Sequence, residues 1–216
     1  MTILVTGATG FIGSHLVSQL LEEGEDIVCM VRRTSNTEFL EKQGVKLKIG
    51  DLRGEGLESA VSGGIDTIYH LGAYYTFFGP KKLHLETNLE GTKKLFNAAE
   101  AAGVDHFIYC STSEVIGPVP CPGPVDETAL YGPVYFYGKV KQLTEEWLQK
   151  QTSSTAWTII RPSGVYGPRS IDDIGYYLIM DYAHKALTSR FSVAGGKGIV
   201  HFTFVKDIVQ GLPTVI

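Results

Sequence analysis

The stretch TILVTGATGFIG, residues 2–13, decides the fold. A short apolar run typical of a buried strand leads directly into Gly7, Gly10 and Gly13, and residues 12–23 have the apolar spacing of a helix. Glycines at such a junction allow a tight turn and a close approach of backbone to ligand, and the helix start presents N–H groups to negative charge. In this context the spacing G-x-x-G-x-x-G predicts a loop that binds a dinucleotide pyrophosphate, although a plain tight turn also uses glycines.

The chain beyond this loop repeats the alternation of short strands with longer helices. The strand-like runs are TILVT, DIVCMV, VKLKIG, DTIYHLG, HFIYCS and WTIIRP, and the helical patterns between them cover 12–23, 36–43, 55–62, 83–102 and 134–151. Apolar strands that do not alternate with polar residues are buried on both faces, which favours a parallel sheet between two helical layers. The sequence therefore predicts a doubly wound α/β domain, the Rossmann fold.

The pattern loosens after RPSGVYGP, residues 161–168. One further strand-like run, GIVHFTF, and the start of a helix at Lys206 follow. We expect a Rossmann domain over residues 1–165 and a partial, smaller substrate-binding region over 166–216 that looks truncated.

Composition excludes several classes of protein. A formal net charge of -4, with no Lys/Arg cluster larger than Arg32–Arg33, argues against a nucleic-acid surface. The apolar run after Met1 is too short for a signal peptide and no other run approaches a membrane span, so we expect a cytoplasmic location. The three cysteines lack metal-ligand spacing, which predicts buried thiols and no metal site. A small molecule is the expected partner.

The end of the second strand bears on the choice of cofactor. It reads Val31, Arg32, Arg33, with no carboxylate to bind a ribose 2′-hydroxyl. Guanidinium groups suit a 2′-phosphate, so we predict a preference for NADP, with NAD still open. The alternative is that both arginines lie on a solvated loop and bind no cofactor.

The stretch YFYGKVK, residues 135–141, places two tyrosines four residues before two lysines, which is one face of a helix in each pair. A nearby ammonium lowers the pKa of a tyrosine, so either pair could serve proton transfer. An amphipathic helix with surface lysines would give the same spacing. Helical geometry favours Tyr137 over Tyr135 only weakly, and leaves the choice open.

The glycine pattern, GDL at 50–52, HLGA at 70–73, TNLEGTKKLFNAA at 87–99, FIYCSTSEVIGP at 107–118 and the Tyr-x-x-x-Lys pairs together resemble the extended short-chain dehydrogenase/reductases. The likeness covers nearly the whole chain. It is nearest to the 3β-hydroxysteroid dehydrogenase and dihydroflavonol reductase branch, with nucleotide-sugar epimerases more distant. Dimers in this family often form through the helices that include the one bearing the tyrosine, so the resemblance also allows a homodimer.

The resemblance implies a role for each motif. A glutamate four residues beyond the lysine, Glu145, fits the pair Tyr137 and Lys141. In the family the tyrosine exchanges a proton with the substrate oxygen during hydride transfer, and the lysine lowers its pKa. The family's catalytic hydroxyl falls on Thr112, with Ser111 and Ser113 as rivals.

The same resemblance implies a set of cofactor-binding positions. They are Gly7, Thr9, Gly10, Phe11, Ile12, Gly13, Arg32, Arg33, Asp51, Leu52, Gly72, Ala73, Asn88, Tyr137, Lys141, Pro162 and Val165. Asn88 and the turn residues could equally be local structure, and His70 is expected to be a hydrogen-bonded core histidine.

The run AYYTFF, residues 73–78, follows the fourth strand at the predicted ligand edge of the sheet. It would place Tyr75 and Phe77 near the substrate, together with Thr112 and Ser113. Aromatic side chains there favour an apolar, ring-bearing substrate, with ordinary packing under a loop as the alternative.

The sequence therefore predicts an NADP-preferring enzyme that interconverts an alcohol and a carbonyl. A nucleotide-sugar epimerase or dehydratase with retained NAD is the first alternative, because it would use the same catalytic positions. A non-catalytic NADP sensor is the second, and the presence of the Tyr-x-x-x-Lys pair disfavours it.

Overall fold

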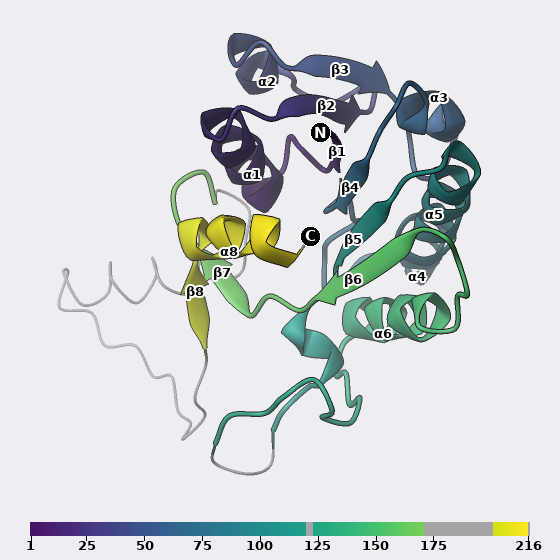
Figure 1. Ribbon diagram of the computed structural model, residues 1–216. Coiled ribbons are helices and arrows are strands. Elements are labelled where there is room, and N and C mark those ends of the chain that lie inside the picture. Colours follow the sequence, from purple (N-terminus) through teal and green to yellow (C-terminus); the bar gives the residue numbers. More distant parts are fainter. Residues whose placement is uncertain (120–122, 171–200, 216) are drawn as a thin grey trace, which may run out of the picture.

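A parallel sheet of six strands forms the centre of the molecule in the computed structural model, which describes residues 1–119, 123–170 and 201–215 (Figure 1). Its strands are β1 (Thr2–Thr6), β2 (Asp26–Val31), β3 (Lys46–Ile49), β4 (Thr67–His70), β5 (His106–Cys110) and β6 (Ala156–Ile160). They lie in the order β3-β2-β1-β4-β5-β6, and every neighbouring pair is parallel. The predicted doubly wound α/β fold is confirmed.

Helices cover both faces of this sheet. One face packs against α1 (Phe11–Glu22), α2 (Glu38–Lys42) and α8 (Val205–Gly211), and the other against α3 (Leu57–Val61), α5 (Gly91–Ala102) and α6 (Phe136–Leu148). Leu4, Ile68 and Phe107 point to the second layer, whereas Ile3, Val5 and Ile108 point to the first. Neighbouring residues of one strand thus enter different cores, which explains why these strands read as continuous apolar runs.

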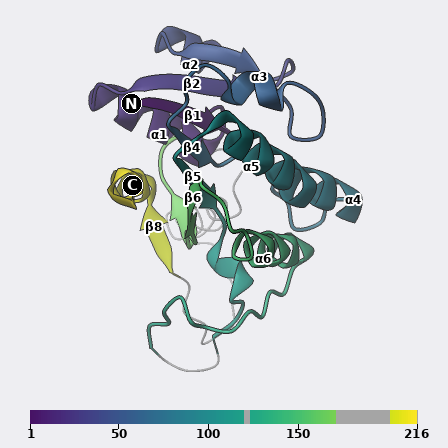
Figure 2. The same ribbon diagram turned by 45° about the vertical axis from the view of Figure 1, so that its right-hand side comes forward.

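The helix expected over 83–102 is divided into three parts. α4 (Lys81–His84) leads into a π-helical turn, η1 (Leu85–Glu90), and then into α5. Figure 2 shows α4 and α5 in line, so the π turn leaves the axis nearly straight. A π turn often marks a functional position, and this one contains Asn88.

The second region is described only at its two ends. β7 (Gly164–Tyr166) spans the predicted boundary near residue 165 and pairs in parallel with β8 (Phe202–Phe204), which precedes α8 and the 3₁₀ turn η3 (Leu212–Val215). Most of the loose pattern from 169 to 191, residues 198–200 of the strand-like run and Cys121 lie outside the described residues. Among the helices that are described, none has the length and apolar character needed to cross a membrane.

Candidate active site

The glycine loop folds tightly between β1 and α1. Gly7 has a φ of +70°, and a Cβ there would lie 2.7 Å from the backbone nitrogen of Gly72. A Cβ at Gly13 would lie 2.2 Å from the carbonyl oxygen of Gly7. These contacts explain why glycine is needed at both positions. α1 begins at Phe11, with Gly10 as its N-cap residue. Its first turn contains no acidic residue, so the first backbone N–H groups make this end of the helix electropositive.

A cleft of about 1190 Å³ lies above this loop, at the carboxyl ends of the parallel strands. Ligands bind at this edge in open α/β sheets. The cleft is lined by all the predicted site residues except two. The lining ones are Gly7, Thr9, Gly10, Phe11, Ile12, Gly13, Arg32, Asp51, Leu52, Gly72, Ala73, Tyr75, Phe77, Thr112, Ser113, Tyr137, Lys141, Pro162 and Val165.

The two exceptions are Arg33 and Asn88. Arg33 is exposed in the turn after β2 and does not line the cleft. Asn88 is buried behind the cleft wall, where its amide bonds both backbone groups of Tyr74 at 2.7 and 3.0 Å. Neither residue lines the cleft in this structure, and their roles in binding a cofactor stay predictions.

The two tyrosine–lysine pairs have different surroundings. Tyr135 is the N-cap residue of α6, with an extended backbone and a side chain that is 43% exposed. It therefore lies outside the helix that would align it with Lys139. Tyr137 and Lys141 are both inside α6, both buried, and both line the cleft. The structure thus brings the second pair, not the first, to the ligand edge.

Burial governs the ionisation of this pair. Desolvation raises the pKa of Tyr137 well above its usual value and lowers the pKa of Lys141 to about 8. The Lys141 ammonium donates a hydrogen bond to the carbonyl oxygen of Cys110 at 2.7 Å and lies 5.8 Å from the centre of the Tyr137 ring. The expected lowering of the tyrosine pKa by Lys141 is therefore wrong for the structure in this form, because burial outweighs the charge.

The three hydroxyl groups that follow β5 differ in their hydrogen-bond partners. Ser111 is buried and donates a hydrogen bond to Glu145, which also accepts from Tyr131 at 2.8 Å and pairs with Arg161 at 2.6 Å. The Ser111 hydroxyl is thus committed to the protein's interior. All three residues line the cleft, but only Ser111 has its hydroxyl group bonded to Glu145.

Thr112 is also oriented by its own turn. Its hydroxyl oxygen accepts a hydrogen bond from the backbone N–H of Glu114 at 3.2 Å, as the cap of a short 3₁₀ helix, η2 (Ser113–Val115). Because that oxygen is already an acceptor, the hydroxyl hydrogen is free to point to a group in the cleft.

Aromatic side chains cover Tyr137 at the mouth of the cleft. The centre of the Tyr75 ring lies 5.1 Å and that of Phe77 6.3 Å from the centre of the Tyr137 ring, and both contacts are edge-to-face. Phe77 also contacts the ring of Tyr135 at 4.6 Å, and Phe78 is 88% exposed. The predicted aromatic segment thus lies where a substrate would meet Tyr137.

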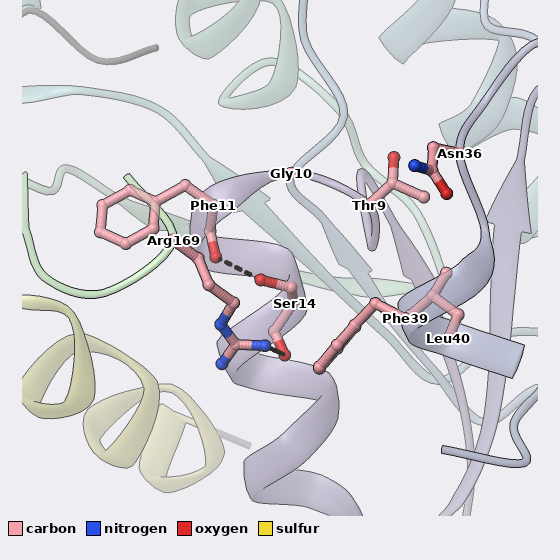
Figure 3. Close-up of a pocket in the computed structure, with 8 residues that line it drawn as sticks. All are labelled: Thr9, Gly10, Phe11, Ser14, Asn36, Phe39, Leu40 and Arg169. Atoms are coloured by element: carbon pink, nitrogen blue, oxygen red, sulfur yellow. Dashed lines mark hydrogen bonds between the residues drawn. The ribbon is translucent and has the colours of Figure 1, made fainter. Parts of the chain in front are cut away.

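The sequence analysis missed Arg169 and Glu114. Figure 3 shows a smaller pocket of about 150 Å³ beside the start of α1, where the guanidinium of Arg169 lies near Ser14 and Phe39. Arg169 stacks 4.6 Å from the centre of the Phe39 ring and bonds His15 Nδ1 at 2.8 Å. No local pattern could pair positions 15 and 169, because the contact depends on the tertiary fold.

Glu114 lines the cleft and holds the start of α6. Its Oε1 accepts hydrogen bonds from the backbone N–H groups of Tyr135 at 2.8 Å and Val134 at 3.1 Å. A carboxylate at a helix N-terminus is a recognised signal, but here it comes from another element, 22 positions before the helix begins. This contact fixes the approach of the chain to Tyr137.

The profile of the family described as "NAD dependent epimerase/dehydratase family" matches residues 3–216. Among curated proteins, the sterol-4-alpha-carboxylate 3-dehydrogenase, decarboxylating, of Bos taurus is 30% identical over 212 residues, which are 96% of this chain and 58% of that protein. An uncharacterized UDP-glucose epimerase of Bacillus subtilis is 30% identical over 242 residues, 100% of this chain and 72% of that protein. The chain thus spans 58% of the length of the first of these relatives.

Solved structures show the same likeness. The UDP-glucose 4-epimerase of Thermus thermophilus in complex with NAD has a TM-score of 0.84 and 27% identity, over 100% of this chain and 74% of that one. The UDP-glucose 4-epimerase of Thermotoga maritima with UDP-glucose has a TM-score of 0.87 and 26% identity, over 100% and 73% of the two chains.

Proposed function

The chain belongs to the NAD-dependent epimerase/dehydratase family, and we propose that it is an NADP-preferring oxidoreductase that interconverts an alcohol and a carbonyl on an apolar, ring-bearing small molecule. One observation carries the proposal. The pair Tyr137 and Lys141 lines the same cleft as the glycine loop, so a proton-transfer group and a dinucleotide site share one space.

The residues of the loop fit a dinucleotide. The close contacts of Gly7 and Gly13 leave backbone, not side chains, at the start of α1, which suits a pyrophosphate. Arg32 lines the cleft at the end of β2, where a 2′-phosphate of the ribose would lie, and Asp51 and Leu52 line it at positions that would flank the adenine. When bound, the nicotinamide dinucleotide supplies or accepts the hydride.

The chain's own groups handle the substrate oxygen. Thr112 donates a hydrogen bond to it, because the hydroxyl oxygen is already held by Glu114. Tyr137, whose raised pKa keeps the phenol protonated at neutral pH, gives its proton to the oxygen when a carbonyl is reduced. The buried ammonium of Lys141 then stabilises the phenolate, and in the oxidation direction the same groups act in reverse.

The mouth of the cleft supports the substrate class. Tyr75 and Phe77 present ring surfaces beside Tyr137, and edge-to-face contacts with an aromatic or alicyclic ring are favourable there. The sterol and hydroxysteroid dehydrogenases among the relatives are named for ring-bearing substrates, which is consistent with this choice.

Cofactor titration followed by a substrate screen tests this proposal. NADP and NAD are titrated into the protein, and ring-bearing alcohols and ketones are then screened for a change in nicotinamide absorbance. We expect tighter binding of NADP and a change in absorbance with apolar ring substrates. Equal or tighter binding of NAD would refute the cofactor preference, and binding with no absorbance change across the set would refute the redox activity.

A nucleotide-sugar epimerase with retained NAD is the second candidate. The likeness to the Thermus thermophilus and Thermotoga maritima epimerases favours it, and such an enzyme would use the same three catalytic positions. Arg32 and the aromatic mouth count against it. Copurification of NAD together with tight binding of UDP-glucose would promote it over the first candidate.

Location, assembly and domain division complete the proposal. The free thiols of Cys29 and Cys110 are consistent with the reducing cytoplasm. The domain boundary near residue 165 follows from the loosening of the pattern after RPSGVYGP, and the homodimer follows from the resemblance. Light scattering of the purified protein tests the dimer, and limited proteolysis tests the boundary.

A further inference from the structure

His70 ends β4 inside the protein, directly opposite Thr6 in the register of β1. Its side chain is 1% exposed, and both ring nitrogens have partners. Nδ1 lies 2.7 Å from the hydroxyl oxygen of Thr6, and Nε2 lies 2.9 Å from that of Thr92 on α5. This geometry agrees with the expectation of a hydrogen-bonded core histidine. Its partners also connect the ring to the cleft, because Thr6 is one of the lining residues.

The direction of each hydrogen bond follows from the groups at the two ends. Thr92 must donate to the carbonyl oxygen of Asn88, 2.8 Å away, so it accepts from His70 Nε2. Nδ1 of the neutral ring is then an acceptor, and Thr6 donates to it. Thr6 in turn accepts from the backbone N–H of Gly72 at 3.1 Å. A single tautomer of His70 satisfies the whole chain of bonds.

The ring also stays neutral. Burial, and then the charge of Lys141, lower the pKa of His70 to about 3. The other groups against the ring are uncharged: the two threonines, Phe107 at 5.6 Å and Tyr109 at 5.8 Å between ring centres. The tautomer therefore persists across the physiological pH range.

The two ends of this hydrogen-bond chain belong to the two halves of the cleft. At the loop end, Thr6 directly precedes Gly7, and its second partner Gly72 lies against the loop, since a Cβ on Gly7 would lie 2.7 Å from the nitrogen of Gly72. At the other end the side-chain amide of Asn88 bonds both backbone groups of Tyr74. Tyr74 precedes Tyr75, whose ring covers Tyr137.

We propose that His70 is a positioning residue that couples the glycine loop to the aromatic segment 73–78 through these hydrogen bonds and Asn88, whose backbone carbonyl bonds Thr92 and whose side chain bonds Tyr74. The inference rests on the proposed function only in its assumption that the glycine loop binds the cofactor and that the aromatic segment contacts the substrate. Thr6, which precedes Gly7, positions His70 and Thr92. Asn88 then positions the segment that covers Tyr137.

Hydrogen–deuterium exchange of the cofactor-free protein tests the coupling without any turnover. Thr6→Val removes the bond to His70 and also that to the N–H of Gly72, two residues before Tyr74, and we expect the Tyr74 amide to exchange roughly 5-fold faster, the effect of losing one internal hydrogen bond. The matched control is Thr158→Val, which removes another threonine–histidine bond of the sheet, that of Thr158 to His106 at 2.8 Å. It should leave Tyr74 unchanged.

A second pair of variants identifies the histidine itself. His70→Gln keeps one donor and one acceptor and should retain most of the protection of Tyr74, whereas His70→Val removes both and should match or exceed Thr6→Val. NADP should slow exchange over 73–78 in the wild type and not in Thr6→Val. Unchanged exchange at Tyr74 in His70→Val, which leaves the bond between Thr6 and Gly72 in place, or equal acceleration in Thr158→Val, overturns the proposal. A failure of NADP to bind refutes the proposed function, while the cofactor-free comparison still decides the coupling.

Discussion

The proposed chemistry needs Tyr137 and Lys141, and burial disfavours the charged form of each residue. Tyr137 retains its proton more strongly than a free phenol, and Lys141 releases its proton more easily than a free amine. The 2.7 Å bond from Lys141 to the carbonyl oxygen of Cys110 compensates part of the cost of the buried ammonium. At neutral pH Lys141 is still an ammonium, so the charge that the proposed chemistry has to create is the phenolate of Tyr137.

The low pKa of Lys141 has a measurable effect on stability. A shift from 10.5 to about 8 means that burying the charged form costs on the order of 3 kcal/mol. The native state loses this proton first, so the wild type gains stability as pH rises from 8 to 10.5, and that gain is lost as pH falls through 8. Lys141→Met should lack this gain.

Urea unfolding of the wild type and Lys141→Met across this pH range measures the difference, with the exposed Lys139→Met as the control. If the difference in the free energy of unfolding between wild type and Lys141→Met does not change with pH, that result would contradict a buried lysine with a lowered pKa.

The two adjacent arginines should differ in their effect on cofactor binding. Arg32 lines the cleft and Arg33 does not. Arg32→Gln should weaken NADP binding by roughly 10-fold, the size of a partly exposed charge-assisted hydrogen bond, and leave NAD binding unchanged. Arg33→Gln has the same change in charge and should bind both as the wild type does. Equal losses in the two variants would indicate a diffuse field effect in place of direct contact.

For single residues, the sequence predicted the positions of the candidate site better than the side chains that these residues contact. The spacing of YFYGKVK left both pairs open, because it could not show that α6 begins after Tyr135. The choice among Ser111, Thr112 and Ser113 likewise depended on Glu145, which lies 34 positions away from Ser111 and is brought to it by the fold.

Among the elements, the junction of β1 and α1 depends most on its sequence. A Cβ at Gly13 would overlap the Gly7 carbonyl at 2.2 Å, whereas one at Gly10 would lie 3.1 Å from it. Gly13→Ala should therefore lower the free energy of unfolding by about 1–3 kcal/mol and weaken NADP binding, because the loop must open. Gly10→Ala needs only a small adjustment and should lose less of both.

Urea unfolding and NADP titration of the two variants measure this order. Gly13→Ala that binds NADP as tightly as Gly10→Ala would show that the loop is not the cofactor site.

The helix over 83–102 shows what local pattern cannot predict. Its apolar spacing is helical throughout, yet a π turn interrupts it at Leu85–Glu90. A Cβ on Gly91 would lie 2.7 Å from Leu52, and the Asn88 carbonyl also accepts a bond from Thr144 of α6 at 3.1 Å. Contacts from other elements thus set the turn, and none of them is visible in the segment itself.

For the whole molecule, the alternation of strands and helices was sufficient to predict the architecture. Strand-like runs buried on both faces require two helical layers, and the structure has one core on each side of the sheet. The contact between His15 and Arg169 was beyond prediction, because it joins α1 to the segment after β7. The arrangement brings the loop, the hydroxyl turn and α6 to one sheet edge, which is what the proposed chemistry requires.

The rate of nicotinamide absorbance change with an accepted substrate, compared between Tyr137→Phe and Tyr135→Phe, tests this arrangement most directly. We predict that Tyr137→Phe loses roughly 10²- to 10⁴-fold in turnover, the usual contribution of a general acid, with little change in NADP affinity. Tyr135→Phe should keep near wild-type turnover. Retained activity in Tyr137→Phe, with loss in Tyr135→Phe, would contradict the account.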